Sequence, residues 1–72
     1  MPTEAQQKIM DAIVRLTEAQ GFPPTTREIA DDLGMWNSQV GRALQRLREE
    51  GLVSWQDNRA RTLVVNGRSS EA

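Results

Sequence analysis

Polar side chains that can bond to nucleic-acid bases recur at helical spacing in the middle of this 72-residue chain. If the apolar residues at 40, 44 and 47 form the buried face of a helix, a step of about 100° per residue places Ser38, Arg42 and Gln45 on the opposite face. An arginine can bond guanine O6 and N7 together, and a glutamine can do the same for adenine N6 and N7. These three side chains are therefore suited to reading base edges in a DNA major groove.

Residues around this row complete a predicted DNA-binding set. Gln39 and Gly41 flank the row, and Arg46 lies on its shoulder, where it is better placed for a phosphate. Glycine is costly inside a helix, and two explanations of Gly41 are open: close approach of the backbone to DNA, or avoidance of a clash with the preceding helix. The remaining members of the set are Thr26, Arg27, Trp36, Asn37, Arg59 and Arg61.

Trp36 and the two arginines at 59 and 61 lie outside the predicted recognition helix. Trp36 precedes the helix, where a large aromatic ring can press on the sugar-phosphate backbone, stack on a neighbouring helix or join a protein interface. We favour the DNA contact. Arg59 and Arg61 are expected at the tip and on the return strand of a hairpin, from which they can reach a minor groove or its phosphates. Trp55 is expected to pack beneath that hairpin as part of the core.

Composition argues against most other chemistries. The chain has no cysteine and no histidine, which excludes disulfides, thiolate or imidazole metal ligands and histidine-activated nucleophiles. Asp31 and Asp32 are adjacent, but neighbours on a helix point about 100° apart and no calcium loop surrounds them. We expect no enzymatic activity, no cofactor and no small-molecule ligand. Without an apolar run of membrane-spanning length or a signal-peptide pattern, we expect no membrane association and a cytoplasmic location.

The charges are unevenly distributed, although the formal net charge is only −1. Residues 1–34 hold three basic and six acidic side chains, whereas residues 35–72 hold six basic and four acidic ones. From position 35 to 48 there are three arginines and no acid. Phosphate contact requires such a local basic face, and global charge matters mainly for long-range steering.

The stretch from Thr26 to Gln45 has the spacing of a helix-turn-helix. Ala30 is small where two helices would cross, Gly34 tolerates positive φ at the turn, and Val40 can bury the second helix against the first. The inner face is completed by Ile29, Leu33, Met35, Leu44 and Leu47. The alternative is a plain helical hairpin that binds nothing.

The flanking sequence predicts an α+β fold, a winged helix-turn-helix in which three helices precede a two-stranded β-hairpin, the wing. Capping boxes at Thr3 and Thr25 open the first two helices, which end near Gly21 and at Gly34. The third starts around Asn37 or Ser38, either of which can cap it, and ends at Gly51. Alternating apolar residues predict hairpin strands, with positions 57–60 between them: Val53, Trp55, Leu63 and Val65. We expect one domain over residues 1–66, with a polar tail or the start of a linker over 67–72.

Nearly the whole chain, from Thr3 to Val65, resembles the N-terminal DNA-binding domain of LexA, the bacterial SOS repressor. The resemblance depends on the segments TEAQQKIMDAI, GFPPTTREIADDLG, GLVSW and RTLVV. GFPPT is the specific part, because the other elements recur in many winged helix regulators. The resemblance implies a bacterial or phage repressor that binds a palindromic operator as a dimer. The sequence itself offers no long heptad stripe and no obvious free apolar strand edge for a strong dimer, so we expect pairing to be weak in solution and assisted by DNA.

The chain departs from the LexA pattern in its recognition helix. Gly41 and Arg42 replace an acidic pair, and the turn before the helix is one residue shorter, which argues against an SOS operator. LexA proteins continue into a self-cleaving Ser-Lys peptidase domain, and we expect no self-cleavage here, where Lys8 is the only lysine. The competing function is a winged helix adaptor or phage inhibitor that holds another protein through Trp36, the wing or the first helix.

Overall fold

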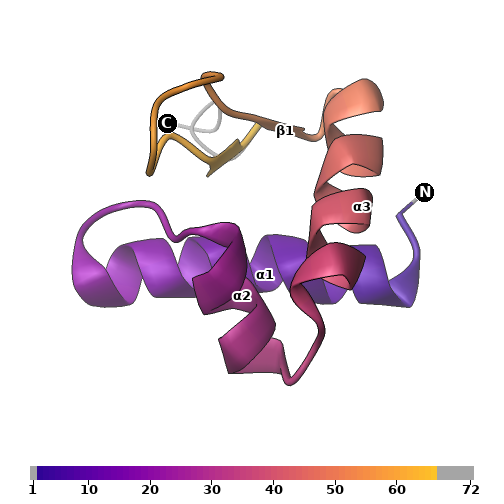
Figure 1. The fold of residues 1–72 in the computed structure, drawn as a ribbon, viewed down its shortest axis with the longest axis horizontal. Coiled ribbons are helices and arrows are strands. Elements are labelled where there is room, and N and C mark those ends of the chain that lie inside the picture. The colour runs from indigo at the N-terminus through magenta and orange to yellow at the C-terminus, as the bar shows by residue number, and fades with distance from the viewer. Residues whose placement is uncertain (1, 67–72) are drawn as a thin grey trace.

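A computed structural model describes residues 2–66, and it confirms the predicted fold class. Figure 1 shows α1 along the long axis, α3 standing across it, and the loop between the two strands lying above the start of α2. Three helices are followed by an antiparallel two-stranded hairpin, which is the winged helix-turn-helix arrangement. The elements are α1 (Glu4–Gln20), α2 (Thr26–Leu33), α3 (Asn37–Glu49), β1 (Val53–Ser54) and β2 (Val64–Val65). The polar tail expected over 67–72 lies outside the described residues.

Both predicted capping boxes form. The Thr3 hydroxyl accepts the Gln6 amide at 3.1 Å, and Gln6 Oε1 accepts the Thr3 amide at 2.9 Å. Thr25 and Glu28 make the same reciprocal pair at 3.2 and 3.0 Å. Each box satisfies two backbone donors that the first helical turn leaves without partners, so α1 and α2 begin where the sequence predicts.

The first residue of α3, Asn37, agrees with the prediction, but the cap differs. The N-cap residue is Trp36, one position before Asn37 and two before Ser38, and neither of those side chains caps the helix. Instead, Gln39 Oε1 accepts the Trp36 backbone N–H at 3.0 Å. A glutamine at the third helical position can make this bond whatever residue occupies the N-cap, because it needs only the backbone amide. The turn between α2 and α3 is correspondingly short.

A single core joins the helices to the hairpin. Ala30 and Val40, the small residue and the packing residue of the helix-turn-helix, are both buried as predicted, whereas Leu33 and Met35 are half-buried at its edge. Gly34 adopts φ 69°, the left-handed conformation predicted for the turn. The buried apolar residues are Ile9, Met10, Ala12, Ile13, Ile29, Ala30, Val40, Leu44, Leu47, Val53 and Leu63.

The hairpin has shorter strands and a longer loop than the sequence suggests. Val53 pairs with Val65 and Ser54 with Val64, so the loop runs from 55 to 63. Trp55 lies in this loop, half-buried against the core as expected. The placement of Arg61 on the return strand was wrong, because its φ of 59° is left-handed and incompatible with an extended strand.

Two arginines tie this loop to the helices. Arg61 makes a bidentate ion pair with Glu28 of α2, with both N···O distances at 3.0 Å. The Arg48 guanidinium of α3 lies 3.2 Å from Asp57 Oδ1 and stacks 4.2 Å from the centroid of the Trp55 ring. Hydrogen bonding to Arg61, followed by the Thr25 amide, lowers the pKa of Glu28 from 4.5 to about 2. Side chains, more than strand pairing, therefore hold the loop in place.

Alanine substitutions at two glycines should have opposite effects on stability, one in the turn of the helix-turn-helix and the other in its recognition helix. A Cβ added at Gly41 would meet no heavy atom within 4 Å beyond its own turn of α3. Gly41→Ala should therefore raise the free energy of unfolding by about 1 kcal/mol, because alanine has the higher helix propensity. Gly34→Ala, the matched control, should lower it by about 1–2 kcal/mol, because it forces a side chain into the left-handed region. Urea unfolding of both variants measures the difference, and a destabilised Gly41→Ala variant would contradict the open space at this position.

The depressed pKa of Glu28 makes part of the stability pH-dependent. Because the folded carboxyl titrates near pH 2 and the ordinary one near 4.5, its contribution is complete above pH 4.5 and is lost as the pH falls toward 2. Glu28→Gln keeps an acceptor for the Thr25 amide but does not titrate, so its Tm should fall less steeply than that of the wild type across this window. Circular dichroism melts at several pH values provide the measurement. Glu18→Gln, which removes an exposed carboxylate outside the ion pairs of residues 2–66, should retain the wild-type slope.

Candidate nucleic-acid interface

The exposed face of α3 carries the predicted row of polar side chains. Ser38, Arg42 and Gln45 are all exposed, and the three apolar residues at 40, 44 and 47 are buried on the opposite face. The orientation of the helix thus agrees with the prediction from its period. Because the buried face fixes the helix rotation, the row is presented to solvent as one surface.

The start of α3 carries three more members of the predicted DNA-binding set, and one of them is engaged in a hydrogen bond within the helix. The Trp36 side chain is 76% exposed, so the stacking of this residue on a neighbouring helix, one of its three interpretations, is wrong. Asn37 is also exposed. Gln39 is exposed, but its carboxamide oxygen is engaged by the Trp36 amide. Reading adenine through both the oxygen and the nitrogen of Gln39 would compete with this capping bond.

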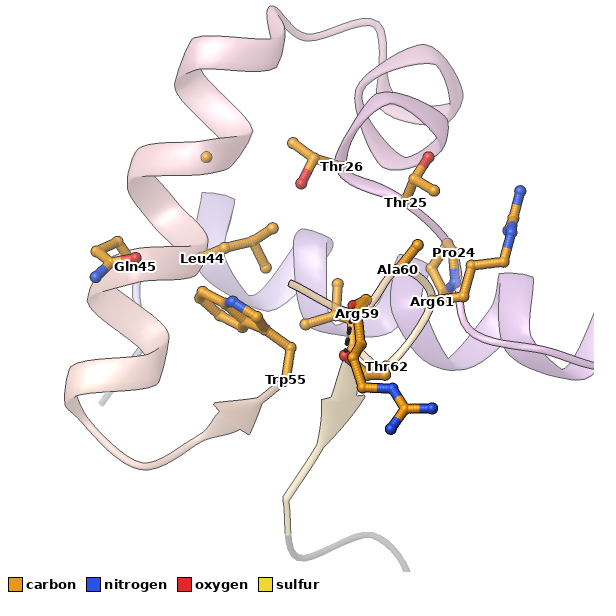
Figure 2. Close-up of a pocket in the computed structure, with 12 residues that line it drawn as sticks. Pro24, Thr25, Thr26, Leu44, Gln45, Trp55, Arg59, Ala60, Arg61 and Thr62 are labelled. Carbon is orange, nitrogen blue, oxygen red and sulfur yellow. Dashed lines mark hydrogen bonds between the residues drawn. The ribbon is translucent and has the colours of Figure 1, made fainter. Parts of the chain in front are cut away.

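A groove of about 410 Å³ lies between α3 and the β1–β2 loop (Figure 2). From the predicted set it brings together residues of three elements: the start of α2, the middle of α3 and the loop. These residues are Thr26, Gly41, Gln45, Arg59 and Arg61. The other lining residues are Pro24, Thr25, Leu44, Trp55, Ala60, Thr62 and Leu63. The groove combines hydroxyl, carboxamide and guanidinium groups with an apolar wall.

Gly41 lines the wall of this groove contributed by α3. The clash with α2 that was one explanation of this glycine is wrong, since a Cβ there would meet nothing within 4 Å. No positive φ requires glycine at this position either. The remaining explanation is that the bare backbone leaves room for something outside the fold to approach α3.

The arginines divide into paired and unpaired groups among residues 2–66. Arg46 lies 3.7 Å from Glu50, Arg48 pairs with Asp57, and Arg61 pairs with Glu28. Arg27, Arg42 and Arg59 form no ion pair within the described part of the chain. These three come from α2, α3 and the loop, so each element next to the groove keeps one guanidinium available for an external anion.

Sequence reasoning missed the internal roles of Arg48 and Arg61. Arg61 was placed in the predicted DNA-binding set and Arg48 was counted in the basic stretch from 35 to 48, yet each binds a carboxylate and lies against an aromatic ring. Glu28 was recognised only as a capping residue. Its partner Arg61 lies 33 positions further along the chain, and no local pattern in the sequence signals a contact over that separation.

The described residues include neither a candidate metal site nor a candidate membrane span. Within residues 2–66 no group of three or more acidic side chains is placed to hold a metal ion. In the same part of the chain no helix has the length and apolar character needed to cross a membrane.

Comparison with known proteins agrees with this geometry. A family model described as the LexA DNA binding domain matches residues 2–62. The LexA repressor of Acetivibrio thermocellus is 36% identical over 69 residues, which cover 93% of this chain and 32% of that protein. The LexA repressors of Myxococcus xanthus and Oleidesulfovibrio alaskensis are 35% and 32% identical over 68 and 63 residues. These alignments cover 93% and 88% of this chain and 31% and 30% of the two repressors.

The chain thus spans about a third of the length of these relatives, and the part that it matches is the helix-turn-helix with its wing. The matched segment contains the whole predicted DNA-binding set, from Thr26 to Arg61. By fold, by sequence and by the arrangement of its polar surface, this chain belongs to the family of LexA DNA-binding domains.

Proposed function

We propose that this domain is a sequence-specific double-stranded DNA-binding module of a transcriptional repressor, with α3 in the major groove and the wing on the backbone or minor groove. The observation that carries the proposal is the exposed row of Ser38, Arg42 and Gln45 beside the groove under the wing. Family membership and the repressor names of the relatives support it. The role is one of binding rather than catalysis, in the cytoplasm, where a repressor meets its operator.

Base reading would depend mainly on Arg42. Its guanidinium is exposed and has no carboxylate partner among residues 2–66, so all its donors are available to a guanine edge. Gln45, one helical turn further on, offers both a donor and an acceptor to adenine. Gly41 would let the DNA approach the α3 backbone between these side chains and the wing. Together they favour an operator with a guanine in each half-site.

Phosphate contacts would hold α3 in register without reading sequence. Thr26 and Arg27 lie in the first turn of α2, and Asn37 lies in the first turn of α3. Backbone amides at helix starts favour anions, and the Arg27 side chain adds a full charge. Arg46 lies near the end of α3, where its weak 3.7 Å pair with Glu50 can open to a phosphate.

Binding of a full operator would require two copies of the domain. A single module of this kind buries about 600–1,000 Å² on DNA, too little for strong discrimination against a genome of competing sites. The exposed large apolar side chains of residues 2–66 are Phe22, Trp36 and Val64, which lie in the loop after α1, in the turn before α3 and in β2. The described surface therefore offers little for a strong dimer, and pairing on adjacent half-sites is the expected mode.

One observation favours a second candidate function. Trp36 is 76% exposed at the turn before α3, and a tryptophan so exposed is a common anchor of protein interfaces. An adaptor that holds another protein through this side chain would need no free Arg42. Selection of binding sites from random duplexes at two salt concentrations separates the two functions, because an adaptor would enrich no sequence. Absence of any duplex binding at low salt would rule out the DNA-binding proposal.

Arg42→Ala should relax sequence preference at one base pair. Loss of a bidentate arginine-guanine contact costs about 1–3 kcal/mol at that position and leaves the rest of the site unaffected. Affinities for a set of duplexes with single base-pair changes measure this. Arg46→Ala is the matched control, because it removes the same charge from the same helix and should weaken all duplexes alike. If Arg42→Ala lowered the affinity for every duplex equally, Arg42 would contact a phosphate and not a base.

Titration should show two chains on a duplex with two half-sites. Sedimentation of the free protein at micromolar concentration should give mainly monomer, because the described surface offers little for a dimer. Saturation at one chain, with full affinity for a lone half-site, would contradict the paired mode. A stable dimer without DNA would place the interface on a surface other than those argued above.

A further inference from the structure

The two arginines of the β1–β2 loop are both exposed, but they differ in their partners. Arg59 is exposed and forms no ion pair within the described part of the chain. Arg61 is directed toward Pro24 and the start of α2, whereas Arg59 leaves the loop on the other side (Figure 2). Arg59 and Arg61 look equivalent in the sequence, but their different partners in the structure indicate different roles.

Three of the five N–H donors of Arg61 are already engaged within the fold. Its Nη1 donates to Glu28 Oε1 at 3.0 Å and to the Pro23 carbonyl at 3.2 Å, while Nη2 donates to Glu28 Oε2 at 3.0 Å. The flat face of the guanidinium lies 4.7 Å from the centroid of the Phe22 ring. For Arg61 to reach a phosphate, it would have to leave all of these partners and abandon the Glu28 carboxylate.

We propose that Arg61 is a positioning residue, which fixes the wing against α2 through Glu28, and that Arg59 is the arginine of the wing that contacts DNA. This inference rests on the DNA-binding function proposed above. It assigns different roles to two residues that the sequence placed together in one binding set.

The proposed mechanism is a shift in the population of wing positions. The hairpin has two residue pairs only, so strand pairing alone holds a nine-residue loop weakly. The ion pair between Arg61 and Glu28 anchors the loop to α2, in addition to the Arg48–Asp57 pair with α3, and it raises the fraction of molecules whose wing is ready for DNA. Apparent affinity is the intrinsic affinity multiplied by that fraction. Removal of either partner should therefore lower affinity without removing a DNA contact.

Glu28→Gln gives a test in which the two possible roles of Arg61 predict opposite signs. The glutamine still accepts the Thr25 amide, so the capping box of α2 remains. If Arg61 contacts DNA, Glu28→Gln frees it and removes a repelling carboxylate, so affinity rises. If Arg61 positions the wing, affinity falls by on the order of three-fold, the scale of an exposed bidentate pair.

The salt dependence of binding separates positioning from contact. Each phosphate contact contributes about 0.9 to the slope of log K against log salt concentration. Arg59→Gln should reduce this slope by about 0.9, whereas Arg61→Gln should leave it unchanged while lowering affinity as much as Glu28→Gln does. The double variant should bind no more weakly than either single variant, because both remove the same anchor. Circular dichroism at the assay temperature confirms that each variant is folded.

The Arg15→Gln variant is the matched control. Arg15 makes a bidentate pair with Asp32 that joins α1 to α2, away from the wing, so its loss should leave DNA affinity and slope unchanged. The inference is overturned if Glu28→Gln strengthens binding, if Arg61→Gln flattens the slope, or if both variants lower Tm but leave affinity unchanged. Failure of the wild-type domain to bind any duplex would instead overturn the proposed function itself.

Discussion

The close crossing of α2 and α3 is the constraint on which the exposed polar surface depends. Ala30 leaves room for the crossing, Gly34 turns the chain through a left-handed residue, and Val40 buries the second helix against the first. Because an interior of this density fixes the rotation of a packed helix, burial of one face of α3 decides which residues face outward. The row from Ser38 to Gln45 is therefore a consequence of packing on the other side of the helix.

The distribution of acids explains how a chain of net charge −1 keeps a basic surface. Three carboxylates, those of Glu28, Glu50 and Asp57, are paired with arginines of the second half of the chain. These pairs brace the wing and the end of α3, and within residues 2–66 they leave Arg42 and Arg59 without an acidic partner. Counting charges along the sequence overestimates the cations available to DNA, since some of them act inside the fold.

The resemblance to LexA implies an acidic pair at the positions that Gly41 and Arg42 occupy in this chain. The open space around Gly41 shows that the fold does not require a glycine there. A carboxylate accepts from the amino group of cytosine, whereas an arginine donates to O6 and N7 of guanine, so the exchange changes the base that can be bonded. The framework of the family is thus kept, and we expect the surface that reads DNA to differ from that of LexA.

The sequence by itself determined the features set by neighbours along the chain. Capping boxes act across three residues and helix periods across one or two turns, so α1, α2 and the outward face of α3 were all predictable. The helix-turn-helix spacing and the hairpin were predictable for the same reason, and the resemblance to LexA agreed with them. The first residue of α3 was predicted, but its cap was not, because the Gln39 side chain accepts the Trp36 backbone N–H and no side chain at position 37 or 38 caps the helix.

Only the tertiary structure decided which arginines are available and where the groove lies. The partner of Arg61 is 33 residues away and that of Arg48 is nine residues away across a turn. Such contacts depend on how the hairpin packs on the helices, and side-chain type alone does not reveal them. The groove between α3 and the wing has the same origin, since its walls come from three separate parts of the chain that meet only after folding.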